Sequence, residues 1–425
     1  MRIALVACFL LSILPINVSA GDRYVTVSGS DTSNDCSNPL SPCATIDHAI
    51  GQATAGDTVK VACGTYNENI RISTSINPLF LQGGWSSDFS TRSDDPSLTV
   101  IDGGGSDRVL KLDVNLWVVL TMEGFKITNG YNASGCGGLY ASAQPETSTM
   151  DLTLINNIFT NNNGGTASGG AICAGSSQGG SMTLTAENNI IRNNEAGTGS
   201  GIALDAYNNG ETHAQLTNNI IADNGSASIG GGIYVKIYSG NIDVDLTNNT
   251  ITNNSSSPIG GGVVVISQGS GYSSTVDSTN DIIWGNSPYD VYIAPWDDVS
   301  TAEVTTFYSD VGSVEVSDTY GSGGTYNEGE GVIDAEPLFI NAAHGNYHLR
   351  GNSPCINAGI LEKRVWVGSW IYYDFSVPEY DFEGDPRASD WVETTPNHYY
   401  KYCDIGADEY TPSFVPGIPL LLLGN

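Results

Sequence analysis

NNIFTNN, from Asn156 to Asn162, is the stretch that decides the fold, because it returns four times further along the chain. The copies are NNIIRNN from Asn188, NNIIADN from Asn218, NNTITNN from Asn248 and NDIIWGN from Asn280, at steps of 32, 30, 30 and 32 residues. A glycine motif keeps the same spacing, as GGLY from Gly137, GGAI from Gly169, GSGI from Gly199, GGGI from Gly230 and GGGV from Gly260. A repeat of about 30 residues indicates a solenoid.

The residues between these motifs alternate between apolar and polar, which is typical of β-strands with one buried face. The apolar columns are Leu154, Ala186, Leu216, Leu246 and Leu152, Leu184, Ala214, Val244, and the polar column between them is Thr153, Thr185, Gln215, Asp245. The sequence therefore predicts an all-β protein, a single-stranded right-handed parallel β-helix with three strands per coil. We interpret the recurring Asn162, Asn194, Asn224, Asn254 and Asn286 as a structural ladder, since stacked amides can bond one another.

These repeats resemble those of the right-handed parallel β-helix, or pectin-lyase-like, superfamily, and in particular those of polymorphic outer-membrane proteins. YVTVSGSD, CATIDHAI and GDTVKVACGTYNENI, between Tyr24 and Ile70, resemble the N-terminal cap of exported bacterial β-helix proteins, with a short capping helix from Thr45 to Ala53. AEPLFINAAHGNYHLRGNSPCINAG from Ala335, DFEGDPR from Asp381 and CDIGADEY from Cys403 resemble a choice-of-anchor C-terminal domain. The resemblance implies export and display at the cell surface.

The expected organisation has five parts. Residues 1–20 read as a signal peptide, with Arg2 before an apolar run and Val18-Ser19-Ala20 before a cut at Gly21. Residues 21–100 form the N-terminal cap and first coils, 101–330 the β-helix repeats, 331–410 the choice-of-anchor-like region and 411–425 a tail. No later segment has 18 consecutive apolar residues, so we expect no transmembrane span in the mature chain. The predicted location is secreted or at the bacterial cell surface.

The charge of the chain excludes some partners. Fifteen basic and 46 acidic residues give a formal net charge of −31, which opposes binding to a phosphate backbone or to an anionic membrane. The 21 Tyr and 7 Trp offer faces on which sugars can stack. We therefore expect a polysaccharide or a cell-surface component as partner, and no nucleic acid.

Export would allow disulfides among the seven cysteines that follow the signal. The expected pairs are Cys36 with Cys43, across a short polar loop, and Cys355 with Cys403, across the C-terminal region. The odd count leaves at least one thiol unpaired or intermolecular. Zinc binding is the alternative, but the chain has no CxxC spacing.

Two outward clusters on the predicted solenoid are candidate sites. In the first, Asp243 and Asp245 face outward on one strand, and Asp277 lies in register beside Asp245. Hard oxygen ligands of this kind could hold calcium, which is the one cofactor expected. The alternative is a solvated acidic face. In the second, Asp205 and Lys236 share an outward column, with Tyr234 two positions before Lys236. Lys236 could act as the base of a polysaccharide lyase, and the alternative is a cross-strand ion pair.

Two classes of function stay open at this point. The first is an exported surface protein that binds carbohydrate, or adheres to a surface, without turnover, since the repeats are complete and a catalytic set is not. The second is a calcium-dependent polysaccharide lyase, or a glycoside hydrolase, acting on an anionic polysaccharide. Polysaccharide-lyase chemistry is what the superfamily resemblance implies, but its polygalacturonase-type NTD and GHG motifs are absent from this sequence.

Overall fold

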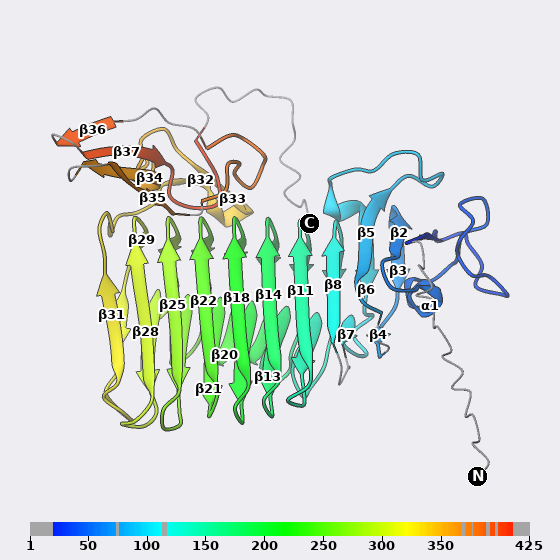
Figure 1. The fold of residues 1–425 in the computed structure, drawn as a ribbon, viewed down its shortest axis with the longest axis horizontal. Helices are drawn as coiled ribbons and strands as arrows, with labels where there is room; N and C mark the ends of the chain where they lie inside the picture. Colours follow the sequence, from blue (N-terminus) through cyan, green and yellow to red (C-terminus); the bar gives the residue numbers. More distant parts are fainter. Residues whose placement is uncertain are drawn as a thin grey trace, which may run out of the picture.

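The computed structural model describes residues 20–73, 76–112, 117–366, 370–375, 377–387, 392–395 and 398–410. Three parallel sheets run side by side along most of this length, and the chain visits them in turn, so that each circuit forms one coil of a β-solenoid (Figure 1). The fold prediction of an all-β parallel β-helix is confirmed. The right-handed sense of the coil stays a prediction.

The longest strands form an eleven-stranded sheet, called sheet A here. Its members are β1 (Asp22–Val25), β2 (Thr58–Ala62), β5 (Leu79–Trp85), β8 (Val118–Glu123), β11 (Thr149–Ile155), β14 (Ser181–Glu187), β18 (Glu211–Thr217), β22 (Asn241–Thr247), β25 (Ser273–Thr279), β28 (Thr301–Phe307) and β31 (Gly324–Glu328). The alternating apolar and polar columns of the sequence, such as Leu152, Thr153 and Leu154, fall on these strands.

Sheets B and C complete the coil, each with nine strands. Sheet B holds β3 (Gly64–Asn67), β6 (Thr99–Asp102), β9 (Lys126–Thr128), β12 (Ile158–Thr160), β15 (Ile190–Arg192), β19 (Ile220–Ala222), β23 (Thr250–Thr252), β26 (Ile282–Trp284) and β29 (Asp310–Val311). Sheet C holds β4 (Ile70–Ile72), β7 (Leu110–Leu112), β10 (Leu139–Ala143), β13 (Ile172–Ser177), β17 (Ile202–Tyr207), β21 (Ile233–Tyr238), β24 (Val263–Ser267), β27 (Val291–Pro295) and β30 (Val314–Val316). A small sheet of β16 (Glu195–Thr198) and β20 (Gly225–Ile229) lies in the connections from B to C.

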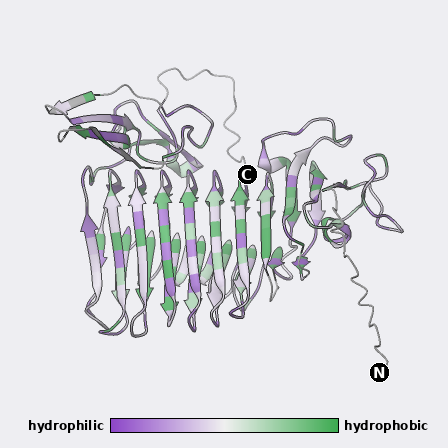
Figure 2. Ribbon diagram, in the orientation of Figure 1, coloured by the Kyte–Doolittle hydropathy of each residue, from purple (hydrophilic) through white to green (hydrophobic). Residues whose placement is uncertain are grey.

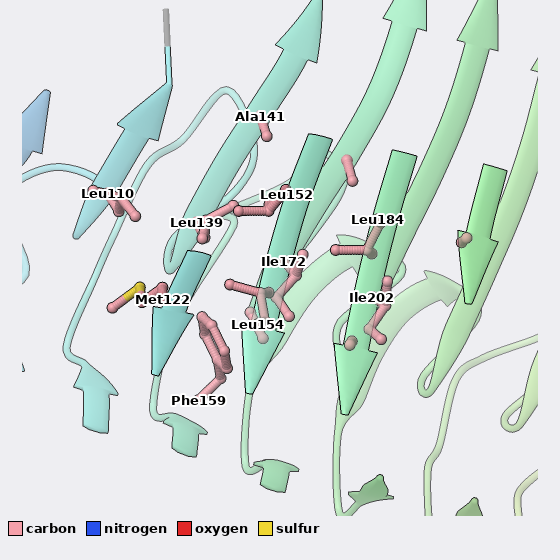
Figure 3. Packing of buried hydrophobic residues seen from close by; sticks show 14 of the residues in the cluster. Leu110, Met122, Leu139, Ala141, Leu152, Leu154, Phe159, Ile172, Leu184 and Ile202 are labelled. Atoms are coloured by element: carbon pink, nitrogen blue, oxygen red, sulfur yellow. The ribbon is translucent and has the colours of Figure 1, made fainter. Parts of the chain in front are cut away.

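The interior is filled by the apolar columns that the alternation predicts. Leu154, Ala186, Leu216 and Leu246 are paired in register across four neighbouring strands, and each is at most 1% exposed. In Figure 3, Leu154 and Phe159 project into the interior that also receives Ile172 from sheet C. Apolar and polar residues alternate along the long strands in Figure 2, because successive side chains of a strand point to opposite faces.

Two buried asparagine ladders hold the turns that follow sheets A and B. In the predicted ladder, Nδ2 of Asn162 donates to Oδ1 of Asn194 over 3.1 Å, and the pattern continues through Asn224, Asn254 and Asn286 to Asp290. A second ladder of the same geometry runs through Asn157, Asn189, Asn219 and Asn249 to Asp281. The side-chain amides therefore satisfy buried turn groups in the successive coils between Asn157 and Asp290.

The N-terminal end carries the short helix where the sequence predicts one. Helix α1 spans Ile46–Gln52, and its Ile46, Ala49 and Ile50 join the hydrophobic core of the solenoid. The side chain of Thr45 caps it by accepting a hydrogen bond from the His48 amide over 3.3 Å. One 3₁₀ turn, η1 (Pro96–Leu98), precedes β6.

The C-terminal region lies against the outside of the solenoid, over the carboxyl ends of the sheet A strands (Figure 1). It contains the hairpin of β32 (Phe339–Asn341) and β33 (Asn346–Leu349), joined by the 3₁₀ turn η2 (Ala342–His344). It also contains an antiparallel sheet of β35 (Trp370–Asp374), β34 (Gly359–Trp366), β37 (His398–Cys403) and β36 (Val392–Thr395). The predicted signal peptide, apart from Ala20, and the tail 411–425 lie outside the described residues.

The structure corrects one of the two expected disulfides. Cys36 and Cys43 are bonded, with Cα atoms 5.2 Å apart, as predicted. Cys355 and Cys403 are both buried free thiols instead, so their predicted bond is wrong. The physical reason is that each sulfur has another neighbour: Cys355 Sγ donates to Oδ2 of Asp310 over 3.1 Å, and Cys403 Sγ lies 3.5 Å from Nδ2 of Asn280.

A second disulfide joins Cys136 to Cys173, 37 residues apart. The sequence reasoning missed it, although the repeat contained the necessary signal. Leu139 pairs with Ile172 in the sheet, an offset of 33 residues, and the same offset carries Cys136 to Gly169 at the start of the GGAI motif that holds Cys173. A Cβ placed on Gly169 would lie 2.0 Å from the Cys173 sulfur, so only glycine leaves room for this bond.

Candidate functional site

The predicted acidic cluster lies on the outer face of sheet A. Asp245 pairs in register with Gln215 and Asp277, and Asp243 pairs with His213 and Thr275. These residues point outward because they occupy the alternate positions to the buried Val244 and Leu246. The sequence therefore placed Asp243, Asp245 and Asp277 on the same face and in the right neighbouring strands.

The three carboxylates are not arranged as a single shell of ligands. Among the described residues, two groups of three have ligand atoms that all lie within 4.8 Å of one another, and the three aspartates are not one of them. The two groups are Cys36, Cys43 and His48, and His348, Glu383 and Asp408. His213 instead lies 3.6 Å from Oδ2 of Asp243 and 3.7 Å from Oδ2 of Asp245. Partial burial, followed by the charges of Asp243 and Asp245, raises the pKa of Asp277.

The two groups that do converge already have other partners. Cys36 and Cys43 are bonded to each other. His348 is held between Asp408, at 2.8 Å from Nδ1, and Glu383, at 3.3 Å from Nε2. Burial opposes its protonation, but the hydrogen bonds to the two carboxylates raise the pKa of His348 to about 10, so it is an imidazolium that joins three segments of the C-terminal region.

An open groove of about 1,020 Å³ lies beside this acidic face. Its floor consists of the carboxyl ends of β11, β14, β18, β22 and β25, and its wall is the segment from Pro378 to Gly384. Asp94, Glu123, Glu187, Asp245, Asp277, Glu379, Asp381 and Glu383 all line it. No Lys, Arg or His is among the described lining residues, although Arg92 pairs with Glu123 and His348 with Glu383 from outside the lining. The remaining carboxylates give the groove a net negative charge.

Aromatic rings lie on the same wall of the acidic groove. Phe375, Tyr380 and Phe382 line it, and Tyr380 is 56% exposed. The groove runs from coil to coil, so an extended ligand could contact several repeats at once. The sequence placed two of its residues, Asp245 and Asp277, in a candidate site, but it did not predict that the segment from Pro378 to Gly384 forms a wall beside them, because that part of the chain has no repeats.

A row of outward asparagines borders the groove, and the side chains on either side of Asn188 donate hydrogen bonds to protein carbonyls. These are the first residues of the NN pairs, and they have a left-handed backbone, such as φ 56° at Asn188. Asn156 donates to the carbonyl of Asp94, and Asn218 to that of Tyr380. Between them Asn188 lines the groove, and its Oδ1 is buried without a hydrogen bond from any described residue.

The second predicted cluster is on sheet C, and the structure separates its members. Asp205 and Lys236 are in register, as predicted, but no ion pair joins their side chains within the described structure. Nζ of Lys236 lies 5.6 Å from the centroid of the Trp296 ring. Tyr234 projects outward from the solenoid but is only 3% exposed, since it belongs to an outer hydrophobic cluster with Val264 and Tyr292. The arrangement does not present Lys236 and Tyr234 together to a substrate.

These features define the class of protein: a parallel β-solenoid with an open acidic groove. Within that class, the chain belongs to a family described as "Protein of unknown function (DUF1565)", which matches residues 27–307. No curated protein matches the chain.

Two solved structures are similar to the chain over most of its length. One is a crystal structure of the pectate lyase Pel9A, at 14% identity and a TM-score of 0.48, covering 93% of this chain and 98% of that one. The other is the complex of XylC with xylose, at 9% identity and a TM-score of 0.32, covering 92% and 98% of the two chains. None of the described helices is long and apolar enough to cross a membrane.

Proposed function

We propose that this protein is an exported surface protein whose acidic groove binds an uncharged glycan chain without cleaving it. The observation that carries the proposal is the lining of the groove, in which carboxylates stand along a channel of about 1,020 Å³ with no basic residue among the described lining. Ionised carboxylates only accept hydrogen bonds, so the groove suits a ligand rich in donors, such as sugar hydroxyl groups.

Two further features support a glycan. Tyr380 offers an exposed ring on which a sugar face can stack. Asn156 and Asn218 donate hydrogen bonds to protein carbonyls, whereas Oδ1 of Asn188, between them in the row, accepts none from the described residues. One hydrogen-bond acceptor beside the groove is therefore left without a protein partner. Export and surface display are supported by the apolar run that precedes Gly21 and by the resemblance of residues 335–410 to choice-of-anchor domains.

The lining weakens the alternative of a lyase that acts on an anionic polysaccharide. Negative lining repels such a polymer unless cations neutralise it, and Lys236, the candidate base, lies on another sheet. Calcium at Asp243, Asp245 and Asp277 stays a proposal, and it would be the natural means of neutralisation.

The test measures binding of the secreted protein to uncharged xylan, mannan and β-glucan and to anionic polygalacturonate and alginate, with and without calcium. We expect at least one uncharged polymer to bind, and binding to weaken about 10-fold or more in Tyr380→Ala and in the Asp245→Asn, Asp277→Asn double variant. The control is Glu211→Gln, on the same sheet but outside the groove lining. Absence of binding to every uncharged polymer, or formation of unsaturated sugar products from an anionic one, would contradict the proposal.

A further inference from the structure

A gap in one outward column of sheet C creates a second, smaller pocket. The column runs through Ser142, Gly175, Asp205 and Lys236 on four adjacent strands. Because Gly175 has no side chain, the carboxylate of Asp205 leans over it: a Cβ on Gly175 would lie 2.0 Å from Oδ1 of Asp205. The glycine therefore determines where this carboxylate lies.

The Asp205 carboxylate has no partner from the described protein. No hydrogen bond or ion pair reaches its oxygens, although the backbone carbonyl of the same residue accepts a bond from Thr212 over 2.9 Å. Lys236, its neighbour in the column, is directed to the Trp296 ring instead. Burial raises the pKa of Asp205 to about 7, and the charge of Lys236 offsets this only in part. A half-buried carboxylate without donors is costly and would be stabilised by a ligand that donates hydrogen bonds.

The pocket around this carboxylate has a volume of about 260 Å³, which is below the roughly 300–1,000 Å³ of sites for drug-sized ligands. Ser142, Gln144 and Ser177 supply hydroxyl and amide groups, and Tyr140 and Tyr207 supply rings. Polar groups that can donate and accept, placed beside aromatic faces, are what an uncharged sugar ring requires.

The charges around the pocket disfavour a cationic ligand. The guanidinium of Arg108 lies 5.0 Å from the centroid of the Tyr140 ring, and Nζ of Lys111 lies 6.0 Å from it, so cations already stand on one side. Lys236 adds a third positive charge on the other side, in register with Asp205. These cations repel an ammonium group.

We infer that the pocket formed by Tyr140, Ser142, Gly175, Asp205 and Tyr207 binds a single uncharged sugar ring, with the Asp205 carboxylate accepting hydrogen bonds from its hydroxyl groups. This site lies on sheet C, apart from the acidic groove on sheet A, and it does not depend on the function proposed for that groove. It would give the protein a contact for a terminal sugar or for a free monosaccharide.

The test is saturation-transfer NMR and titration calorimetry with the methyl glycosides of glucose, galactose, mannose and xylose. We expect at least one to bind, and its affinity to fall about 10-fold or more in Asp205→Ala, which removes the acceptor. Gly175→Ala should have a similar effect, because the added methyl group displaces the carboxylate without removing it. Thermal melting of both variants checks that the solenoid is intact.

Two controls separate this site from the groove. Glu211→Gln removes one negative charge, as Asp205→Ala does, but on sheet A, and it should leave glycoside binding unchanged. Asp205→Ala should leave polysaccharide binding in the groove unchanged, so the two proposals can fail separately. Binding that survives in both Asp205→Ala and Gly175→Ala overturns the inference, and so does the absence of binding for all four glycosides in the parent protein.

Discussion

Arg387 donates from Nη1 to Oε2 of Glu409 over 3.0 Å, inside the C-terminal region, and Arg387 is 3% exposed. The two residues are 22 positions apart in the sequence, and their pair joins the DFEGDPR segment to the CDIGADEY segment. The same guanidinium donates to the carbonyls of Gly406 and Ala407 and to Oδ1 of Asn218 on the solenoid. One buried arginine therefore organises two C-terminal motifs and ties them to a coil of the β-helix.

Two further residues of the same row of outward asparagines, Asn248 and Asn280, also bond to this region. Asn248 donates to the carbonyl of Gly406 over 3.1 Å, and Asn280 donates to that of Ile360 over 2.9 Å. The amide of Ile360 returns a bond to Oδ1 of Asn280 over 2.8 Å. The repeat motif thus has two roles: its second residue supports the coil, and in the three later copies its first residue, Asn218, Asn248 or Asn280, bonds to the C-terminal region.

Replacing Arg387 by Met should loosen the C-terminal region while the solenoid stays folded. Removing one partner of a buried ion pair costs about 3–5 kcal/mol, because the other charge is left without compensation. Hydrogen exchange of peptides from residues 398–410 measures the effect, and we expect faster exchange there than in the sheet A strands. Arg350→Met, at an exposed arginine, is the control. Unchanged protection in Arg387→Met would show that other contacts hold the region.

Asp281 should make stability depend on pH, because it ends an asparagine ladder with a carboxyl group. Burial raises its pKa to about 7, although Ser278 and Asn249 donate hydrogen bonds to it. The folded protein therefore favours the protonated form, and stability is lost as pH rises from about 4 to about 7.

The substitution Asp281→Asn should remove this loss, since Asn occupies the other positions of the ladder. We expect the variant to exceed the parent in free energy of unfolding by about 2–4 kcal/mol at pH 8, and by much less at pH 4. Denaturant unfolding at both pH values checks this, with the exposed Asp318→Asn as control. Equal differences at the two pH values would mean that Asp281 does not titrate on unfolding.

Thiol labelling should distinguish the cysteines of a chain that begins at Gly21. Cys63 is exposed and should react in the folded protein, whereas Cys355 and Cys403 should react only after denaturation without reductant. Burial also raises the pKa of Cys403 to about 12, which keeps it a thiol. Mass spectrometry after alkylation counts the modified residues, and finding Cys355 bonded to Cys403 would contradict the structure.

The bond between Cys136 and Cys173 should stabilise the coils that it joins. Replacing both by Ser should lower the free energy of unfolding by about 2–4 kcal/mol, since the cross-link restricts a loop of this length in the unfolded chain. Chemical unfolding under non-reducing conditions measures the difference. The Cys63→Ser variant, which breaks no bond, is the matched control.

Calcium should raise the melting temperature of the parent protein slightly, if Asp243, Asp245 and Asp277 bind it. Because their oxygens do not converge on one point, we expect a dissociation constant no tighter than about 10⁻⁴–10⁻³ M. A concentration ten times above that constant would stabilise the fold by about 1.4 kcal/mol. A melting scan of the parent and of Asp245→Asn, Asp277→Asn, with and without calcium, tests this. An equal shift in both proteins would place calcium elsewhere.

The sequence alone predicted the solenoid and the contacts within it. Leu216 meets Ala186 and Leu246, and Asn194 meets Asn162 and Asn224, because each coil places the same residue of the repeat directly over its predecessor. In such a fold the neighbour across the sheet is also the equivalent residue one repeat away. The register of Asp245 with Asp277 and of Asp205 with Lys236 could be counted from the motifs for the same reason.

Only the tertiary structure decided the contacts that do not repeat. The wall of the acidic groove, the burial of Arg387 and the separate environments of Cys355 and Cys403 all depend on how a C-terminal region without a period docks on the coils. The direction of a side chain within its column is also not periodic: Lys236 is directed to Trp296, and Asp205 leans over Gly175. Periodicity determines which residues are neighbours, whereas packing against groups from outside the repeat determines which of those neighbours interact.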